Sequence, residues 1–419
     1  MIGLASLTAG FGRWYTTNRI LTWICALTFV NQLGFGAIVP AVPLYARSFG
    51  VSLTAIGLTI AGYGLARLVS SLPAGQVSER LGRRYALLIG GIITVIGNAL
   101  CALATTYELF LAARFVAGLG AGFILTASQI MLADISTPDR RGRIMATYSG
   151  VFSFAVGLGP LVGGILAERV SLEAPFWGYA IMGAGAATLA WFRVPETRNL
   201  RTTPAGGASA RAANSTPRPS FLGQVRIMTV QPGFLLITLV GFATFFSRTG
   251  GLFNVIPVLG QERLSLTADQ IGLGLASISV MAILLAYPAG ALADRFGRKL
   301  VIVPSTILTG VSFYLFLLAP SFVWFMVACL AWAIASGIGG AAPSAYAADI
   351  APTGMNAAAM STFRMFAETG YVLGPLILGF VADFFGANAA LAGTSGFLVV
   401  VGLLFWSMAP EKRHRAAAS

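Results

Sequence analysis

The sequence has few of the residues with which enzymes carry out chemistry. Its 419 residues include one histidine, His414, and three cysteines, Cys25, Cys101 and Cys329, which all lie inside apolar runs. This excludes a histidine-based catalytic centre or metal cluster, and the cysteine spacing is not typical of a disulfide or metal site. The nucleotide-binding pattern Gly-x-x-x-x-Gly-Lys-Ser/Thr is also missing, so the sequence does not indicate that the protein uses ATP as an energy source. We therefore expect a protein that is not an enzyme and needs no cofactor.

Charged residues are scarce as well. They make up 10% of the chain, and 57% of it is apolar, whereas a typical soluble domain is about 25% charged. The net charge of +13 does not indicate nucleic-acid binding, because positive charge in a membrane protein collects on one side and orients the helices. The 50 glycines suit close helix packing in lipid. The composition predicts an all-α membrane protein whose partner is the lipid bilayer, with no nucleic acid bound.

Apolar runs of the length that spans a bilayer, about 20 residues, follow one another along the chain. A polar segment divides them into two sets of six, at 20–44, 54–77, 85–105, 107–133, 144–168, 175–194, 233–258, 269–292, 300–318, 321–347, 359–383 and 388–409. We expect a six-helix bundle at 1–194, a cytoplasmic linker at 195–232 and a second six-helix bundle at 233–419.

The two sets of six spans are copies of one unit. The charged loop at 75–84 recurs at 290–299, an offset of 215 residues that also relates many single positions. Matched pairs include Gly57 and Gly272, Gly122 and Gly337, Asp134 and Asp349, Gly159-Pro160 and Gly374-Pro375, Gly164 and Gly379, and Glu168 and Asp383. A tandem duplication of this kind predicts two pseudo-symmetric bundles, a known way of building transporters.

Basic residues gather in the loops of one side. They follow spans 2, 4, 6 and 8 and close the chain, while the opposite loops hold only Arg47, Arg169 and Arg263. By the positive-inside rule, both termini and the linker lie in the cytoplasm. We expect a multi-pass protein of the plasma membrane, or of the inner membrane if the source is bacterial.

Several motifs together carry a family resemblance. The loop Gly75-x-x-x-Glu79-Arg80-x-Gly82-Arg83-Arg84 and its copy follow the second span of each half, and further motifs are Arg114 with Gly118 and Gly122 in span 4, Gly157-Leu158-Gly159-Pro160 with Gly164 in span 5, and Pro40-Ala41-Val42-Pro43 in span 1. With twelve spans in two halves, the chain resembles the major facilitator superfamily, in particular its drug/proton antiporter branch. Glu79 departs from the family pattern, which usually has aspartate.

The resemblance implies a secondary transporter. It implies a monomer that exports a small organic molecule, as in multidrug resistance, by alternating access and with the proton gradient as its energy source. The runner-up is a facilitator or importer of a small organic anion. A membrane enzyme or a non-transporting receptor is a third class, but the sequence has neither a cluster of reactive side chains nor an additional soluble domain.

The repeated charged loops are predicted to form a conformational latch. Glycine permits a tight turn, an acid can accept hydrogen bonds from a helix N-terminus, and the arginines can reach the aspartate after span 4 or span 10. We expect such contacts when the cytoplasmic side is closed; the alternative is that these charges set topology only. The latch residues are Gly75, Glu79, Arg80, Gly82, Arg83, Asp134, Gly290, Asp294, Arg295, Gly297, Arg298 and Asp349.

Charges inside the spans break the repeat, and such charges are costly and usually functional. Glu368 is the only carboxylate placed well inside a span, and Arg364 lies four residues before it on the same helical face. Burial favours a protonated carboxyl group and a neighbouring arginine favours the carboxylate. We therefore predict that Glu368, Arg364 and Arg114 carry proton coupling; the alternative is a static Glu368–Arg364 ion pair.

The excess of arginine over glutamate within the spans fits an anionic or zwitterionic substrate, provided that the arginines face the cavity. Spans 1, 4, 7 and 10 line the cavity in the family, and spans 2 and 7 carry unmatched arginines. The predicted cavity residues are Asn31, Gln32, Phe35, Arg67, Gln129, Phe245, Arg248, Asn254 and Trp332. Close helix packing is predicted at Gly157, Gly159, Pro160, Gly164, Gly374 and Pro375, since glycine lets helices approach and proline kinks them.

Overall fold

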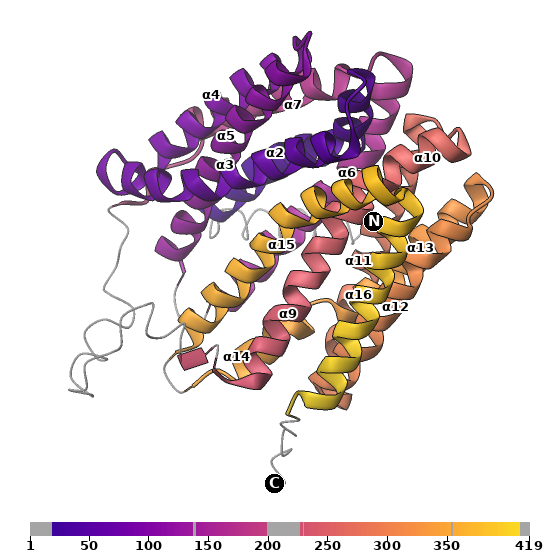
Figure 1. The fold of residues 1–419 in the computed structure, drawn as a ribbon. Coiled ribbons are helices and arrows are strands. Elements are labelled where there is room, and N and C mark those ends of the chain that lie inside the picture. The colour runs from indigo at the N-terminus through magenta and orange to yellow at the C-terminus, as the bar shows by residue number, and fades with distance from the viewer. Residues whose placement is uncertain (1–18, 137–139, 199–226, 229, 353–354, 411–419) are drawn as a thin grey trace, which may run out of the picture.

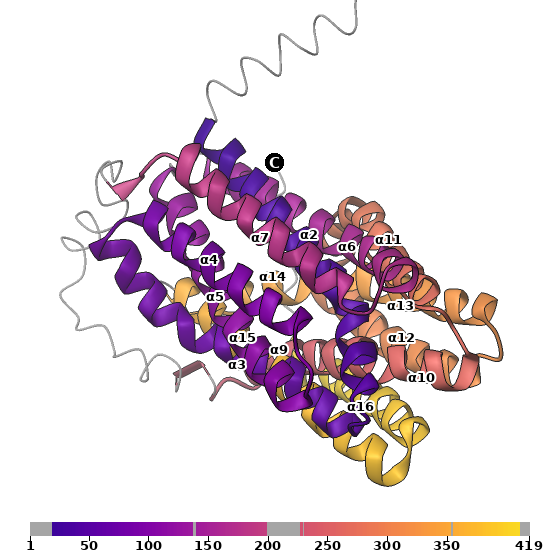
Figure 2. The same cartoon turned by 90° about the horizontal axis from the view of Figure 1, so that it is seen from above.

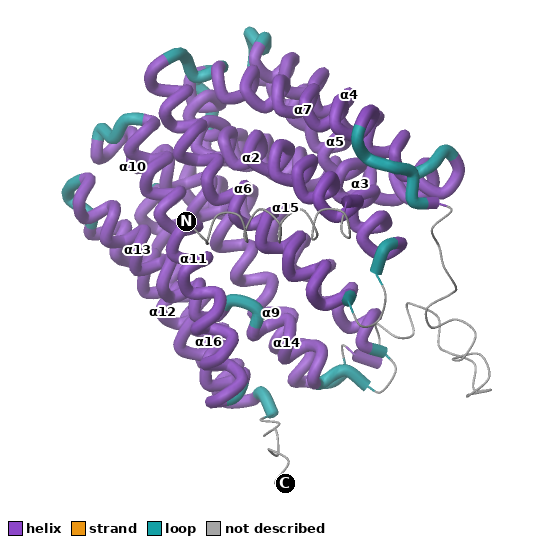
Figure 3. Tube along the Cα trace, turned by 180° about the vertical axis from the view of Figure 1, so that it is seen from behind, coloured by secondary structure: helices purple, strands orange, loops and turns teal. Residues whose placement is uncertain are grey.

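The computed structural model describes residues 19–136, 140–198, 227–228, 230–352 and 355–410. Within these ranges the chain is helical, with short connections and no strand (Figure 3). The first half contains α2 (Arg19–Ser48), α3 (Leu53–Arg80), α4 (Arg83–Ala102), α5 (Tyr107–Asp134), α6 (Arg141–Arg169) and α7 (Ala174–Phe192).

The second half follows the same order. It contains α9 (Pro232–Phe246), η2 (Ser247–Val255), α10 (Ile256–Leu264), α11 (Ala268–Phe296), α12 (Arg298–Leu318), α13 (Phe322–Gly339), α14 (Ala342–Asp349), α15 (Asn356–Phe385) and α16 (Ala387–Met408). One span is divided into α9, η2 and α10, and another into α13 and α14, where Gly340 has φ 37°.

Local sequence explains where many helices begin and end. Ser52 and Thr106 accept hydrogen bonds from Ala55 and Leu109 and so cap α3 and α5. Glycines with positive φ then separate consecutive helices at Gly82, Gly297 and Gly386. Because L-residues rarely adopt that conformation, glycine is required at these sharp connections.

Eleven helical segments of the described chain are long and apolar enough to cross a membrane. The sixth expected span corresponds to α7, which is not among the eleven. It packs against α2 and α4 like the other helices of its half. The all-α fold of about twelve spans is confirmed.

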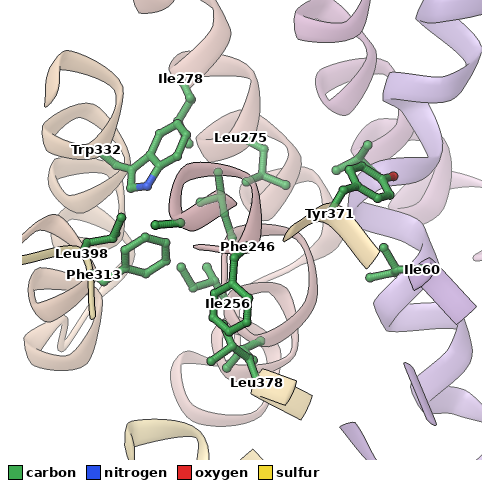
Figure 4. Packing of buried hydrophobic residues seen from close by; sticks show 14 of the residues in the cluster. Ile60, Phe246, Ile256, Leu275, Ile278, Phe313, Trp332, Tyr371, Leu378 and Leu398 are labelled. Carbon is green, nitrogen blue, oxygen red and sulfur yellow. The ribbon is translucent and has the colours of Figure 1, made fainter. Parts of the chain in front are cut away.

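The two halves meet along two helix pairs. Figures 1 and 2 show α2–α7 and α9–α16 as two groups, with α3 beside α15 at one side of the molecule and α6 beside α11 at the other. An apolar core extends through both halves, and in the second half it includes Phe246, Phe313 and Trp332 (Figure 4). A separate core around Leu27 and Met131 lies in the first half.

Candidate functional site

A charge pair joins the two halves between α3 and α15. Arg67 Nη2 donates a hydrogen bond to Glu368 Oε2, and the two side chains are 18% and 23% exposed. The expected neighbour, Arg364, is exposed instead. The alternative of a static Glu368–Arg364 ion pair is therefore not what the structure shows: helical spacing places the two residues on one face, but the packing of α3 against α15 brings Arg67 to the carboxylate.

Tyr371 lies at the centre of this contact. The Arg67 guanidinium carbon is 4.8 Å from the centre of its ring, a favourable cation–π distance. A Cβ on Gly64 of α3 would come 2.8 Å from the same ring, so glycine is needed there for close packing. Figure 4 shows Tyr371 beside Ile60 of α3, at the boundary between the halves.

Arg114 of α5 is buried beside the pair, with 3% of its surface exposed. Its guanidinium carbon lies 4.3 Å from the ring centre of Tyr63, which in turn stacks on Phe35 at 5.6 Å. The Nε and Nη1 atoms of Arg114 are buried without a hydrogen-bond partner. A buried cation whose donors are unused is costly, which marks Arg114 as a candidate to bind an anionic group.

Arg248 lies on the π-helical segment η2, and π-helical turns occur frequently at functional sites. The side chain is half-buried, and its guanidinium carbon is 5.5 Å from the ring centre of Phe253. In the described part of the chain, no ion pair joins Arg114 or Arg248 to a carboxylate. The centre of the molecule therefore holds more arginine than acid.

The other predicted cavity residues have mixed surroundings. Asn31 and Gln32 are buried and bonded to each other through Nδ2 and Oε1 at 3.0 Å, while Gln129 and Phe245 are half-buried. Asn254 is buried and donates to the carbonyl oxygen of Pro375, while its Oδ1 has no hydrogen-bond partner. Trp332 packs in the apolar core with its Nε1 unpartnered. The assignment of both residues to the cavity stays a prediction.

The predicted packing glycines place backbone against backbone. A Cβ on Gly164 would lie 2.6 Å from the carbonyl oxygen of Ala268 in the other half, and one on Gly157 would lie 2.2 Å from Ser279. Gly159 approaches Gly36 within its own half, and Gly374 approaches Phe246.

The contact between the halves is itself two-fold symmetric. A Cβ on Gly57 would meet the Pro375 carbonyl oxygen at 2.1 Å, and its repeat partner Gly272 would meet the Pro160 carbonyl oxygen at 2.3 Å. Repeat-matched residues thus form the boundary between the bundles.

Two repeat-matched carboxylates cap helices of the opposite half. Glu168 Oε2 accepts from the Ala268 amide at 2.9 Å, at the start of α11. Asp383 accepts from the Leu53 and Thr54 amides at 2.8 and 2.7 Å, at the start of α3. An anion at a helix N-terminus is stabilised by unpaired amides and by the helix dipole. These carboxylates therefore hold the halves together at the end opposite the arginine-rich loops.

An ion pair lies at the same end, on the pseudo-two-fold axis. Arg47 and Glu262 are 2.7 Å apart and are related by the repeat offset of 215 residues. At the arginine-rich end, by contrast, Leu72 and Tyr287 are 77% and 88% exposed. The ribbons of the two halves also diverge toward that end (Figure 1). The structure thus has one end closed by contacts between the halves.

The predicted latch residues of the first half form a contact within that half although the two halves diverge at this end. This differs from the prediction that such contacts form when the arginine-rich side is closed. Arg83 is fully buried, and its Nε lies 2.8 Å from Asp134 Oδ2, while Glu79 Oε1 lies 3.1 Å from Arg83 Nη2. The carboxylate that caps α4 is Glu196, which accepts from the amides of Arg83 and Arg84 at 3.0 and 3.1 Å. Sequence reasoning expected a helix cap from Glu79 and did not single out Glu196.

Glycine is required at position 82 for two reasons. Its φ is 112°, and a Cβ there would lie 2.4 Å from Glu196 Oε2. Arg80 is exposed, and its carbonyl oxygen accepts from Arg198. A Cβ on Gly75 would meet no atom within 4 Å among the described residues.

The second-half copy of the loop is more exposed. Arg298 Nε lies 3.3 Å from Asp349 Oδ2, with side chains 19% and 35% exposed. Gly297 has φ 95° at the start of α12, and Gly290 has open space around it. The Arg295 guanidinium lies 5.4 Å from the Phe296 ring centre, and the side chain of Asp294 lies outside the described part.

This difference in exposure predicts unequal stability effects. Asp134→Asn removes the buried carboxylate beside Arg83 and leaves only the half-exposed Glu79, and breaking such a buried pair costs about 3–5 kcal/mol. Asp349→Asn acts on a partly exposed pair and is expected to cost about 0–1 kcal/mol. The measurement is the thermal unfolding midpoint of each variant in detergent. Equal shifts for the two variants would show that burial of the pair is not the cause.

Two functional candidates, Tyr63 and Tyr371, were missed by sequence reasoning. Both correspond to apolar residues in the other half, Ile278 and Val156. The intramembrane charges were identified because the other half has a different residue type at the matched position, and the same comparison would have identified these tyrosines.

Two bundles of membrane helices, with charges gathered where the bundles meet, define a polytopic membrane transporter. The model of the Major Facilitator Superfamily matches residues 24–281 and 244–419, and the chain belongs to that family. The chain is a transporter and not an enzyme.

Relatives of known name agree with this assignment. The chain is 24% identical to an uncharacterized MFS-type transporter of Methanocaldococcus jannaschii over 92% of this chain and 97% of that protein. It is also 24% identical to multidrug resistance protein 2 of Bacillus subtilis, over 93% and 95% of the two chains. Among solved structures, a D-xylose–proton symporter superposes with TM-score 0.73 at 18% identity, over 94% and 99% of the two chains. This last similarity concerns the fold alone.

Proposed function

We propose that the protein exports a small organic molecule in exchange for protons. The observation that carries the proposal is the Arg67–Glu368 pair, which joins the two halves at the level of the other intramembrane charges. Support also comes from the Bacillus subtilis relative, which is named for multidrug resistance. The proposal includes a plasma-membrane location with both termini and the linker between the two bundles in the cytoplasm, a monomer, and the proton gradient as energy source.

With this orientation the closed end faces outward and the structure is inward-facing. The Arg67–Glu368 pair then stabilises the empty, deprotonated transporter in this state. A proton neutralises Glu368 and removes the attraction between α3 and α15. A substrate with a cationic group has the same effect when it binds the carboxylate in place of Arg67. The halves therefore rearrange with either a proton or a substrate bound, and this exclusive occupancy is the requirement for exchange.

A second candidate function is uptake of an organic anion together with a proton. It is favoured by Arg114 and Arg248, which are not paired with a carboxylate in the described chain. An anion that binds Arg67 leaves Glu368 without its partner. In a site of low dielectric, the neutral, protonated form of a carboxyl group is favoured over the carboxylate. Anion and proton would then move in the same direction. The charge of the substrate thus decides whether substrate and proton move in opposite directions or in the same direction.

Proteoliposomes distinguish the two candidates. Vesicles are loaded with a panel of organic amines, or with acids and amides of the same carbon skeletons, and internal pH is followed as each compound leaves. Exchange predicts that the interior becomes acidic as an amine leaves, whereas proton cotransport predicts that it becomes alkaline as an acid leaves. Compound flux without any proton movement would contradict both. Glu368→Gln is the control, because it cannot bind or release the proton.

A further inference from the structure

A cavity of about 550 Å³ lies apart from the Arg67–Glu368 pair, at the arginine-rich end of the first half. The ends of α2, α4, α5, α6 and α7 surround it. Among the residues that the structure describes, its lining contains no acidic side chain and four arginines, which are Arg19, Arg84, Arg140 and Arg193. We call this cavity the arginine pocket. Side chains of one charge enclosing one cavity favour a ligand of the opposite charge.

Aromatic rings position two of these guanidinium groups. The Arg84 guanidinium carbon lies 4.7 Å from the ring centre of Trp191, and that of Arg193 lies 5.3 Å from the ring centre of Trp23. A guanidinium group that stacks through its face keeps its N–H groups at its edge, where they can bind a phosphate in bidentate fashion. Arg84 Nη2 donates to the carbonyl oxygen of Trp191, which holds this guanidinium group in place, and Arg84 Nε is buried without a hydrogen-bond partner, so at least one donor is unused.

The pocket lies where the helices leave the apolar layer. Trp191 and Tyr85 are in edge contact at 6.0 Å, and aromatic residues of this type concentrate at the membrane–water interface. Phe192, which lines the pocket, is 72% exposed. Tyr85, which contacts Trp191, is 47% exposed. A charged lining next to an exposed apolar surface fits a ligand with an anionic head and an apolar tail.

We propose that the arginine pocket binds the phosphate group of an anionic phospholipid, whose acyl chains lie along the exposed surface at Phe192. Basic pockets between membrane helices on the cytoplasmic side bind lipid head groups of this kind. The positive-inside rule accounts for arginine at this end of the molecule. It does not account for the gathering of arginines from four helix ends around one cavity, while Arg80 at the same end lies outside the pocket. A soluble phosphate ester shares the head-group chemistry but leaves the apolar surface uncovered.

Native mass spectrometry of the purified chain tests the proposal. The protein is exposed to mixed micelles of phosphatidylglycerol and phosphatidylcholine, and the retained lipids are counted. We expect preferential retention of phosphatidylglycerol, and a reduction of about 10-fold or more in its affinity in the double variant Arg84→Gln/Arg193→Gln, because two charge-assisted contacts are lost. The matched control is Arg295→Gln, an exposed arginine at the same end of the second half, which is expected to retain the lipid.

Three results would overturn the proposal. These are equal retention of the two lipids, an equal loss in the Arg295→Gln control, and binding of inorganic phosphate to delipidated protein at the pocket without retention of phosphatidylglycerol. The variant Arg84→Lys/Arg193→Lys keeps the charge and provides a folded comparison if the glutamine variant is unstable; we expect it to retain more lipid than the glutamine variant. Because binding is measured without transport, the outcome is independent of the proposed exchange function.

Discussion

Glu368→Gln is expected to abolish proton-coupled transport while leaving exchange of substrate across the membrane measurable, at lower affinity for a cationic substrate that loses its contact with the carboxylate. Glutamine has the size of glutamate but carries no charge, so it resembles the protonated form permanently. The variant should still change between its two orientations, because the Arg67–Glu368 attraction that stabilises the structure described here is lost. Loss of one charge-assisted contact of about 1–3 kcal/mol shifts such a balance by about 5- to 150-fold. The measurement is uphill transport in proteoliposomes under an imposed pH gradient, beside counterflow of labelled substrate.

Arg364→Gln is the matched control for this experiment. It removes an intramembrane charge from the same helix, but Arg364 is exposed and is not the partner of Glu368. We expect uphill transport to remain. If Arg364→Gln stopped coupling and Glu368→Gln did not, the role assigned to the Arg67–Glu368 pair would be wrong.

Asp383→Ala is expected to shift the protein toward the state in which the closed end is open. The substitution removes two amide contacts at the start of α3 and leaves those donors without a carboxylate. At about 1.5–3 kcal/mol for a hydrogen bond to a charged group, even one lost contact corresponds to a population shift of about 10- to 150-fold. Glu168→Ala removes one amide contact at the start of α11 and should have a smaller effect. Spin labels on α3 and α15 would report the two populations by distance.

The exposed pair at the same end provides a control. Arg47 and Glu262 are 38% and 49% exposed, and surface ion pairs contribute about 0–1 kcal/mol. Glu262→Gln should therefore leave the distances between the halves almost unchanged. A shift by Glu262→Gln as large as that caused by Asp383→Ala would mean that charge in general, and not helix capping, closes this end.

The internal repeat shows how far sequence reasoning reaches. Matched positions such as Gly57 and Gly272 indicate a requirement that both bundles share, because the same residue recurs at the repeat offset. The structure shows that they lie where the bundles meet, against Pro375 and Pro160 of the opposite half. The sequence identifies residues under a shared constraint, but the neighbour that imposes the constraint belongs to a different helix and cannot be found by counting along the chain.

The sequence by itself determined the class of protein, the number of spans and the duplication, because these depend on run length, composition and spacing. It also marked Arg67, Arg114, Arg248 and Glu368 as functional candidates, because charge within a span is costly wherever it lies. Only the tertiary structure decided the partners. Glu368 contacts Arg67, which is 301 residues away in the sequence, and Glu196 caps α4 at Arg83, which is 113 residues away. Such contacts depend on how helices pack and which faces they present, and a helical period within one span does not contain that information.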